Sequence, residues 1–143
     1  MLPTLADVAA ARRGKPMPKD PIGRAKAHTT FDREDARKLA LWRQRIQQRD
    51  GLKCRYSGKP VKKTLKLVLD RAEAHHLAPR GNFETRYDVR NGLILSYHVH
   101  EQVERHDLRI EGTKFFMVNG QRYINASAKV RFVNAVTGEV RVG

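Results

Sequence analysis

Four histidines within a window of 26 residues are the side chains of this sequence best suited to chemistry. His75 and His76 are adjacent, Asn91 follows after fourteen intervening residues, and His98 and His100 lie within the next nine positions. Neutral imidazole is a good ligand for a divalent transition metal, and an imidazole without metal can act as a general base near neutral pH. The spacing therefore predicts a small site that combines metal binding with proton transfer.

Two expected strands must position these histidines. Residues 64–77 contain a short apolar run that is typical of a strand reaching His75, and residues 92–96 (GLILS) predict a second strand. Successive side chains on a regular strand point to opposite sides. His75 and His76 can therefore serve one site only where the strand ends and its backbone distorts, with one histidine on the metal and the other left as a base.

A short helix is expected over residues 97–107 (YHVHEQVERHD). His100 and Glu104 are four residues apart on this helix, so their side chains share a face, as neighbouring ligands of one ion must. His98 lies roughly on the opposite face and is the weaker candidate. Carboxylate, like imidazole, is a good ligand for divalent metals.

The sequence before the histidines predicts a longer helix. Thr30 or Asp32 is the expected N-cap, and Gly51 is the expected stop. Leu39, Trp42 and Ile46 fall on one face of this helix, which indicates packing against a core.

The sequence after the histidines changes to a strand pattern. KFFMV, the turn Asn119-Gly120 and QRYINA predict a β-hairpin, and KVRFVNAV predicts a further strand that ends at Thr137-Gly138. We therefore expect an α+β fold, with a basic flexible arm over residues 1–30, a core with its leading helix over residues 31–112 and a C-terminal β-hairpin extension over residues 113–143.

The charge of the chain indicates a polyanionic partner. The sequence has 29 Lys+Arg against 15 Asp+Glu, a formal net charge of +14 and a pI of about 10.5, which is most often a sign of nucleic-acid binding. Residues 53–66 contain no acid. Their six basic residues suit a phosphate-facing surface, and these candidates are Lys53, Arg55, Lys59, Lys62, Lys63 and Lys66.

Cysteine usage and hydropathy predict an intracellular protein. The single cysteine, Cys54, excludes an internal disulfide and fits a reducing compartment. No apolar run approaches the roughly 18 residues that span a bilayer, and the N-terminal residues make a poor secretory signal. We expect no membrane partner and a location in the cytoplasm or nucleoid of a bacterial or phage-infected cell.

Two blocks of the sequence, EAHHLAPR and NGLILSYHVHEQVERHDLRIEG, resemble the HNH endonucleases of the ββα-metal class. The resemblance covers about residues 49–112 and implies a ββα-metal (HNH) core. It also implies that His75 and His100 are metal ligands, that His76 is the general base and that Asn91 pins the loop and helps to place that base. In one branch of the family a further ligand occupies the position of Glu104, which is here either a third ligand or a solvated helix residue or partner for Arg105 or Arg109.

Many HNH proteins flank this motif with two cysteine knuckles that bind a structural zinc. The segment RDGLKCRYSGK resembles the first knuckle, with Cys54 retained and Ser57 in the second place. The second knuckle would fall at Ser96 and Val99. Because one sulfur remains from four, we expect no structural zinc, and we expect Cys54 to be a small buried or half-buried apolar residue.

The resemblance implies a metal-dependent endonuclease that hydrolyses phosphodiester bonds in DNA, most often double-stranded. It needs one divalent ion, for which Mg²⁺, Mn²⁺, Ni²⁺ and Zn²⁺ remain open, as does the choice between nicking and cutting both strands. Arg80 and Arg90 are further candidates for phosphate contacts. The alternatives are a catalytically inactive HNH-like module that binds nucleic acid and a basic structural protein whose histidines are accidental.

Overall fold

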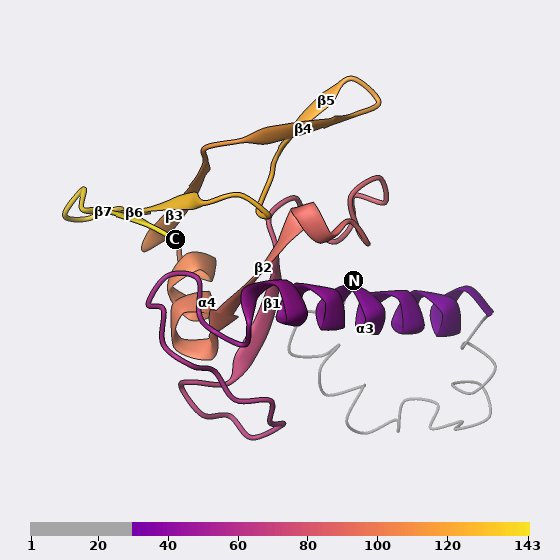
Figure 1. Cartoon of the computed structure of the whole chain (residues 1–143), viewed down its shortest axis with the longest axis horizontal. Coiled ribbons are helices and arrows are strands. Elements are labelled where there is room, and N and C mark those ends of the chain that lie inside the picture. The colour runs from indigo at the N-terminus through magenta and orange to yellow at the C-terminus, as the bar shows by residue number, and fades with distance from the viewer. Residues whose placement is uncertain (1–29) are drawn as a thin grey trace, which may run out of the picture. The chain divides into compact units, whose positions relative to one another are not determined.

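A computed structural model of the chain describes residues 30–143, which form an α+β fold (Figure 1). The chain divides into two compact units between Arg37 and Lys38. The second unit contains every candidate site residue named above. The arm expected over residues 1–30 lies outside the described residues except for Thr30, which begins the first described helix.

Helix α3 (Thr30–Asp50) forms where the sequence predicts it. Leu39, Trp42 and Ile46 are buried, which confirms the expected apolar face. The helix ends before Gly51, whose φ of +70° lies in the left-handed region that glycine adopts without a steric penalty.

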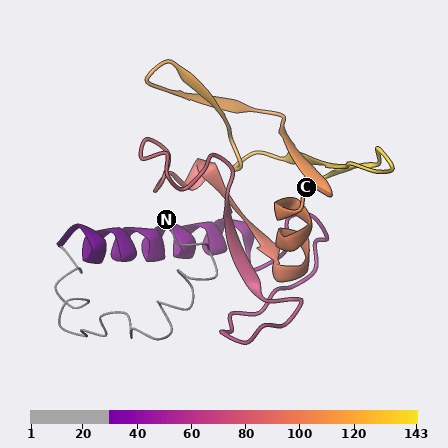
Figure 2. The same cartoon turned by 180° about the vertical axis from the view of Figure 1, so that it is seen from behind.

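The histidines lie on the first of two antiparallel strands and on the helix that follows the second. Strand β1 (Ala72–His76) pairs with β2 (Gly92–Ser96), so that His75 is opposite Leu93 and His76 is opposite Gly92. The chain turns directly from β2 into helix α4 (Tyr97–Glu104) (Figures 1 and 2). Ser96 caps this helix, because its hydroxyl accepts a hydrogen bond of 3.3 Å from the backbone N–H of Val99.

The first strand is shorter than the apolar run suggested. Only Ala72–His76 is strand, and the leucines before it are in a loop, with Leu65, Leu67 and Leu69 exposed by 100%, 72% and 67%. The strand is short because its partner strand is short: β2 ends at Ser96, where the chain enters α4. The carbonyls of Arg71 and Leu69 instead accept hydrogen bonds of 2.8 and 3.0 Å from the N–H groups of Tyr97 and His98 at the start of α4.

The C-terminal strands form two further sheets. Strand β3 (Leu108–Gly112) pairs with β6 (Val130–Asn134), which pairs in turn with β7 (Val140–Val142). Strand β3 was not expected from the sequence. Its pairing with β6 crosses the expected boundary between residues 112 and 113 and joins the C-terminal strands to the core.

The expected hairpin is confirmed as strands β4 (Phe115–Val118) and β5 (Gln121–Ile124). Asn119 and Gly120 form its turn with φ values of +50° and +79°. Two successive positive φ values are what a two-residue hairpin turn needs, and Asn-Gly adopts them most readily.

The core is one cluster that joins the C-terminal half of α3 to the central strands and α4. Its members share near-complete burial and are Trp42, Ile46, Cys54, Val61, Leu93, Ile94, Leu95, Val99, Leu108, Ala126, Val130 and Phe132. Strand β2 contributes three consecutive members, Leu93, Ile94 and Leu95, and its fourth buried residue, Gly92, lies against Trp42 and Ile46 of α3. Within residues 30–143, no helix combines the length and the apolar character that crossing a membrane requires.

Candidate metal and general-base site

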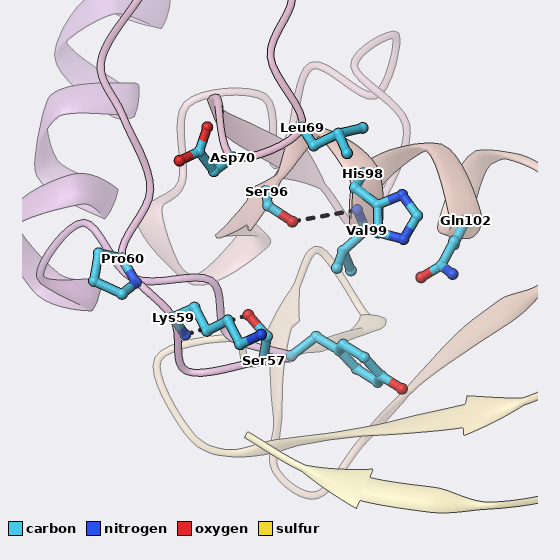
Figure 3. A pocket seen from close by; sticks show the side chains of 10 residues that line it. Ser57, Lys59, Pro60, Leu69, Asp70, Ser96, His98, Val99 and Gln102 are labelled. Atoms are coloured by element: carbon cyan, nitrogen blue, oxygen red, sulfur yellow. Dashed lines mark hydrogen bonds between the residues drawn. The ribbon is translucent and has the colours of Figure 1, made fainter.

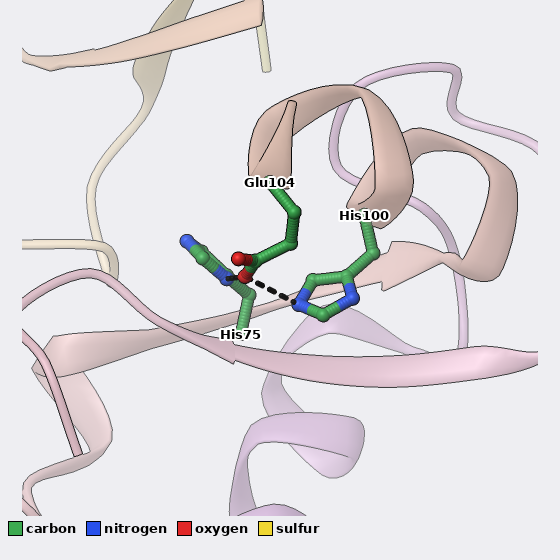
Figure 4. A group of neighbouring side chains, drawn as sticks. All are labelled: His75, His100 and Glu104. Carbon is green, nitrogen blue, oxygen red and sulfur yellow. Dashed lines mark ion pairs between the residues drawn. The ribbon is translucent and has the colours of Figure 1, made fainter. Parts of the chain in front are cut away.

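Three of the predicted residues come together at the end of β1. The Nδ1 atom of His75 lies 3.8 Å from Oε1 of Glu104, and Nε2 of His100 lies 3.3 Å from the same oxygen (Figure 4). One ligand atom from each residue lies within 4.8 Å of the others. Ligands with bonds of about 2.1 Å to one ion are about 3–4 Å apart, so small side-chain rotations would gather all three around a metal.

The surroundings of His75 favour its neutral form. Burial, followed by the neighbouring imidazoles of His100 and His76, lowers the pKa of His75 to about 4. His75 therefore carries no proton charge at neutral pH. A ring nitrogen with a free lone pair is the form that binds a metal.

His76 has different surroundings from His75, as strand alternation requires. Its ring stacks on Trp42 with centroids 3.9 Å apart and planes 9° from parallel. Its Nε2 atom is 3.0 Å from the carbonyl oxygen of Arg86. A carbonyl only accepts hydrogen bonds, so Nε2 carries the hydrogen and Nδ1 of the neutral ring keeps its lone pair.

The pKa of His76 is also lowered, chiefly by burial. The hydrogen bond to the carbonyl of Arg86 opposes this change, whereas the charges of Arg80, Arg86 and Arg43 support it. His76 is therefore a neutral imidazole with one defined tautomer, outside the cluster of His75, His100 and Glu104 that could hold a metal.

Asn91 holds the loop between β1 and β2. Its Oδ1 accepts a hydrogen bond of 2.7 Å from the N–H of Ala78, and its Nδ2 donates to the carbonyls of Ala78 and Thr85, each at 3.2 Å. The side chain is fully buried. This loop contains the Arg86 carbonyl that fixes the tautomer of His76, so the contacts of Asn91 are those that the sequence analysis expected of a loop-pinning residue.

A cavity of about 590 Å³ surrounds these histidines. Arg80 lies on its wall, as do His106 and Arg109, which the sequence analysis missed. Ile110 of β3 and Ile124 of β5 complete this wall. Motif spacing could not reveal Arg109 and Ile110, because β3 is placed by its pairing with the distant strand β6.

The basic candidates divide into exposed and structural residues. Lys53, Lys59, Lys62, Lys63 and Lys66 are exposed, and Lys62 forms an ion pair of 3.4 Å with Asp70. Arg90 is exposed as well, but its guanidinium pairs with Asp88 at 2.8 Å and lies 4.0 Å from the ring centroid of Phe116.

Arg55 was predicted to face phosphate, and this prediction is wrong. Its guanidinium donates to Asp50 at 3.1 Å and to the carbonyls of Ala126, Ala128 and Gly143 at 2.7, 2.8 and 3.2 Å. The side chain is only 14% exposed. Arg55 therefore ties the segment after α3 to the C-terminal strands.

The four positions compared with zinc knuckles also lie close together. Cys54 is buried, and Ser57, Ser96 and Val99 line a cavity of about 350 Å³ beside the start of α4 (Figure 3). Burial raises the pKa of the Cys54 thiol. Hydrogen bonds from the Ser57 hydroxyl and from backbone groups, Ser96 included, lower it further than burial raises it, so the pKa lies below its usual value. Cys54 is thus a buried apolar residue, as expected, with its sulfur in polar contacts.

A buried carboxylate that the sequence analysis missed holds this region. Asp50, with a side chain 3% exposed, accepts hydrogen bonds from Arg49 at 2.8 Å, from Arg55 at 3.1 Å and from the N–H of Ile94 at 3.0 Å. Its negative charge is therefore matched on two sides and reaches the central strand. These contacts link the end of α3, the segment after it and β2.

Comparisons with models of protein families, with curated proteins and with solved structures find no match to this chain. Function is therefore inferred from the chemistry of the site itself.

Proposed function

We propose that the protein is a metal-dependent endonuclease of the HNH, or ββα-metal, type that hydrolyses phosphodiester bonds in double-stranded DNA. The observation that carries the proposal is that two adjacent histidines have different surroundings. His75 joins His100 and Glu104 in a set of metal-ligand type, whereas His76 stays outside this set with Nδ1 available as a base. The order of antiparallel strands followed at once by a helix also supports this type.

The donor set fits a divalent ion. Two imidazoles and a carboxylate suit Mn²⁺, Ni²⁺ or Zn²⁺, and the carboxylate also makes the site acceptable to Mg²⁺. His75, His100 and Glu104 would hold the ion, which supplies charge stabilisation at the scissile phosphate and at the leaving 3′ oxygen.

The residues of the chain account for the remaining steps. His76 takes a proton from water at Nδ1, because its Nε2 is committed to the carbonyl of Arg86. Asn91 keeps that carbonyl in place through the loop it holds. Arg80 lies on the wall of the same cavity, where a cation would attract the phosphate.

A plasmid assay tests the proposal. Supercoiled DNA with Mg²⁺, Mn²⁺, Ni²⁺ or Zn²⁺ should be converted to nicked or linear forms by the wild type, and no conversion should occur with chelator. His75→Ala and His76→Ala should both lose cleavage, whereas His98→Ala, an exposed histidine of α4 outside the ligand set, should retain it. DNA binding without cleavage under every metal would instead identify a binding module.

A further inference from the structure

The hairpin β4–β5 is a two-stranded ribbon with one anchored face. Phe116 lies under the guanidinium of Arg90 at 4.0 Å, and the Tyr123 hydroxyl accepts a hydrogen bond of 3.0 Å from Asn82. Asn119 at the turn donates to Glu84 at 3.0 Å. All three contacts are made to the loop between β1 and β2, so this face fixes the ribbon to the segment that orients His76.

The other face of the ribbon is exposed except at Ile124, which is half-buried against the core. Met117 is 61% exposed, Phe115 is 43% exposed, and the guanidinium of Arg122 lies 4.2 Å from the ring centroid of Phe115. Met117 is opposite Arg122 in the register, and Phe115 is opposite Ile124. These four residues, Phe115, Met117, Arg122 and Ile124, are called the outer ribbon face below.

The outer ribbon face is continuous with the candidate site. Ile124 lies on the wall of the cavity that contains His75, His76 and His100. A substrate phosphate in that cavity would therefore have the ribbon beside it. The face combines apolar side chains with a cation in a chain of net charge +14, which matches a partner that is both polyanionic and stacked.

We infer that the outer ribbon face is a contact surface for the groove of duplex DNA next to the scissile phosphate, an inference that rests on the proposed function. A two-stranded ribbon is narrow enough to enter a groove, and unbranched or aromatic apolar side chains can insert between base steps. Met117 is the expected wedge, and Arg122 contacts the backbone beside it. Cleavage should then be favoured near flexible pyrimidine–purine steps, which open most easily.

The test compares two double variants that change the same chemistry at different places. Met117→Thr with Arg122→Thr removes an apolar side chain and a cation that face each other across the ribbon. Arg131→Thr with Val142→Thr removes a matching exposed pair, also opposite each other, from strands β6 and β7. Threonine suits exposed strand positions.

Each variant is assayed on a 40-base-pair duplex and on thymidine 5′-(p-nitrophenyl phosphate), a diester too small to reach the ribbon. The ribbon variant should bind duplex about tenfold more weakly, with a salt slope smaller by about one contact. It should hydrolyse the small diester like the wild type. The β6–β7 variant should stay within about threefold of the wild type on both substrates, since one distant contact contributes little.

Equal duplex affinities for the two double variants would overturn the inference. A wild type that self-associates through this face in gel filtration, and that binds duplex no more tightly than the ribbon variant, would overturn it as well. If the ribbon variant loses its thermal transition, Met117→Thr and Arg122→Thr are compared singly on the same terms. Failure of the proposed function is seen separately. If the wild type hydrolyses neither substrate with any metal, the duplex affinities of the two double variants can still be measured and compared.

Discussion

At the scale of single residues, His76 and Trp42 form a unit. The carbonyl of Arg86 leaves the imidazole one tautomer, and the stack on Trp42 holds the ring in its orientation. From the sequence, Trp42 was assigned to the core. The indole also donates a hydrogen bond of 2.8 Å to the carbonyl of Asp88. Trp42 therefore packs the core and positions the base with the same ring.

The substitution His76→Ala should lower kcat for plasmid cleavage by about 10²–10⁴-fold, the usual contribution of a general base. Affinity for DNA should change little, because a base acts in the transition state. Gel-shift titration beside the cleavage assay checks both expectations, with His98→Ala as the control. Equal cleavage rates for the wild type and His76→Ala would remove His76 from the mechanism.

The pKa of His75 predicts how the metal-free protein responds to acid. Its folded pKa is about 4 against an ordinary 6.5, so the unfolded chain takes up the proton first as the pH falls. The free energy of unfolding should hold above pH 6.5 and fall by up to about 3 kcal/mol on the way to pH 4. Urea unfolding in chelator at several pH values measures this, and His75→Gln should show a shallower fall.

An unchanged pH dependence in His75→Gln would mean that another group causes the acid sensitivity. His76 is one such group, because burial lowers its pKa too. A double substitution of both histidines separates their contributions.

At the scale of elements, helix α4 offers a paired test of the ligand set. Glu104 faces His75 and His100, whereas Glu101 pairs with Arg105 at 3.4 Å. Glu104→Ala should move the metal-activation curve to higher concentration by about 10–100-fold, the range seen when support of a metal site is lost. Glu101→Ala is the matched control. A curve that is the same for both variants would place Glu104 outside the site.

The loop between β1 and β2 should depend on Asn91. In Asn91→Ala, the N–H of Ala78 and the carbonyls of Ala78 and Thr85 lose their side-chain partner. An unsatisfied buried group costs about 1–3 kcal/mol, so the free energy of unfolding should fall by about that amount or more. Denaturant unfolding measures this loss. A variant as stable as the wild type would show that the loop does not need this clamp.

The elements also show what the sequence could and could not predict. The shared face of His100 and Glu104 was predicted because helical spacing is local, and Asn91 was singled out by the resemblance to HNH endonucleases, directly before the second strand. The prediction that Arg55 faces phosphate was wrong, because no local pattern reveals that a buried Asp50 and distant carbonyls surround it. Arg109 was missed for the same reason: β3 exists only through its pairing with β6.

At the scale of the whole molecule, the charge of +14 predicts salt-sensitive binding. Each neutralised phosphate releases counterions, with a slope of about −0.9 per contact, and we expect at least about four contacts. Fluorescence anisotropy with labelled duplex from 50 to 300 mM salt, roughly the range in which such binding weakens, measures the slope. An affinity independent of salt would show that the basic surface is not the binding surface.

The packing of the whole molecule places Gly92 against the indole that stacks on His76. A Cβ atom at Gly92 would lie 2.3 Å from Trp42 and 2.4 Å from Ile46, although the backbone there is extended and open to any residue. The obstacle is space alone, and the ring that would have to move is the one stacked on His76. In a library with every amino acid at every position, Gly92 would therefore score as intolerant as a catalytic residue. Its side chain is a single hydrogen, so the lost activity would come from a displaced indole and a misaligned base.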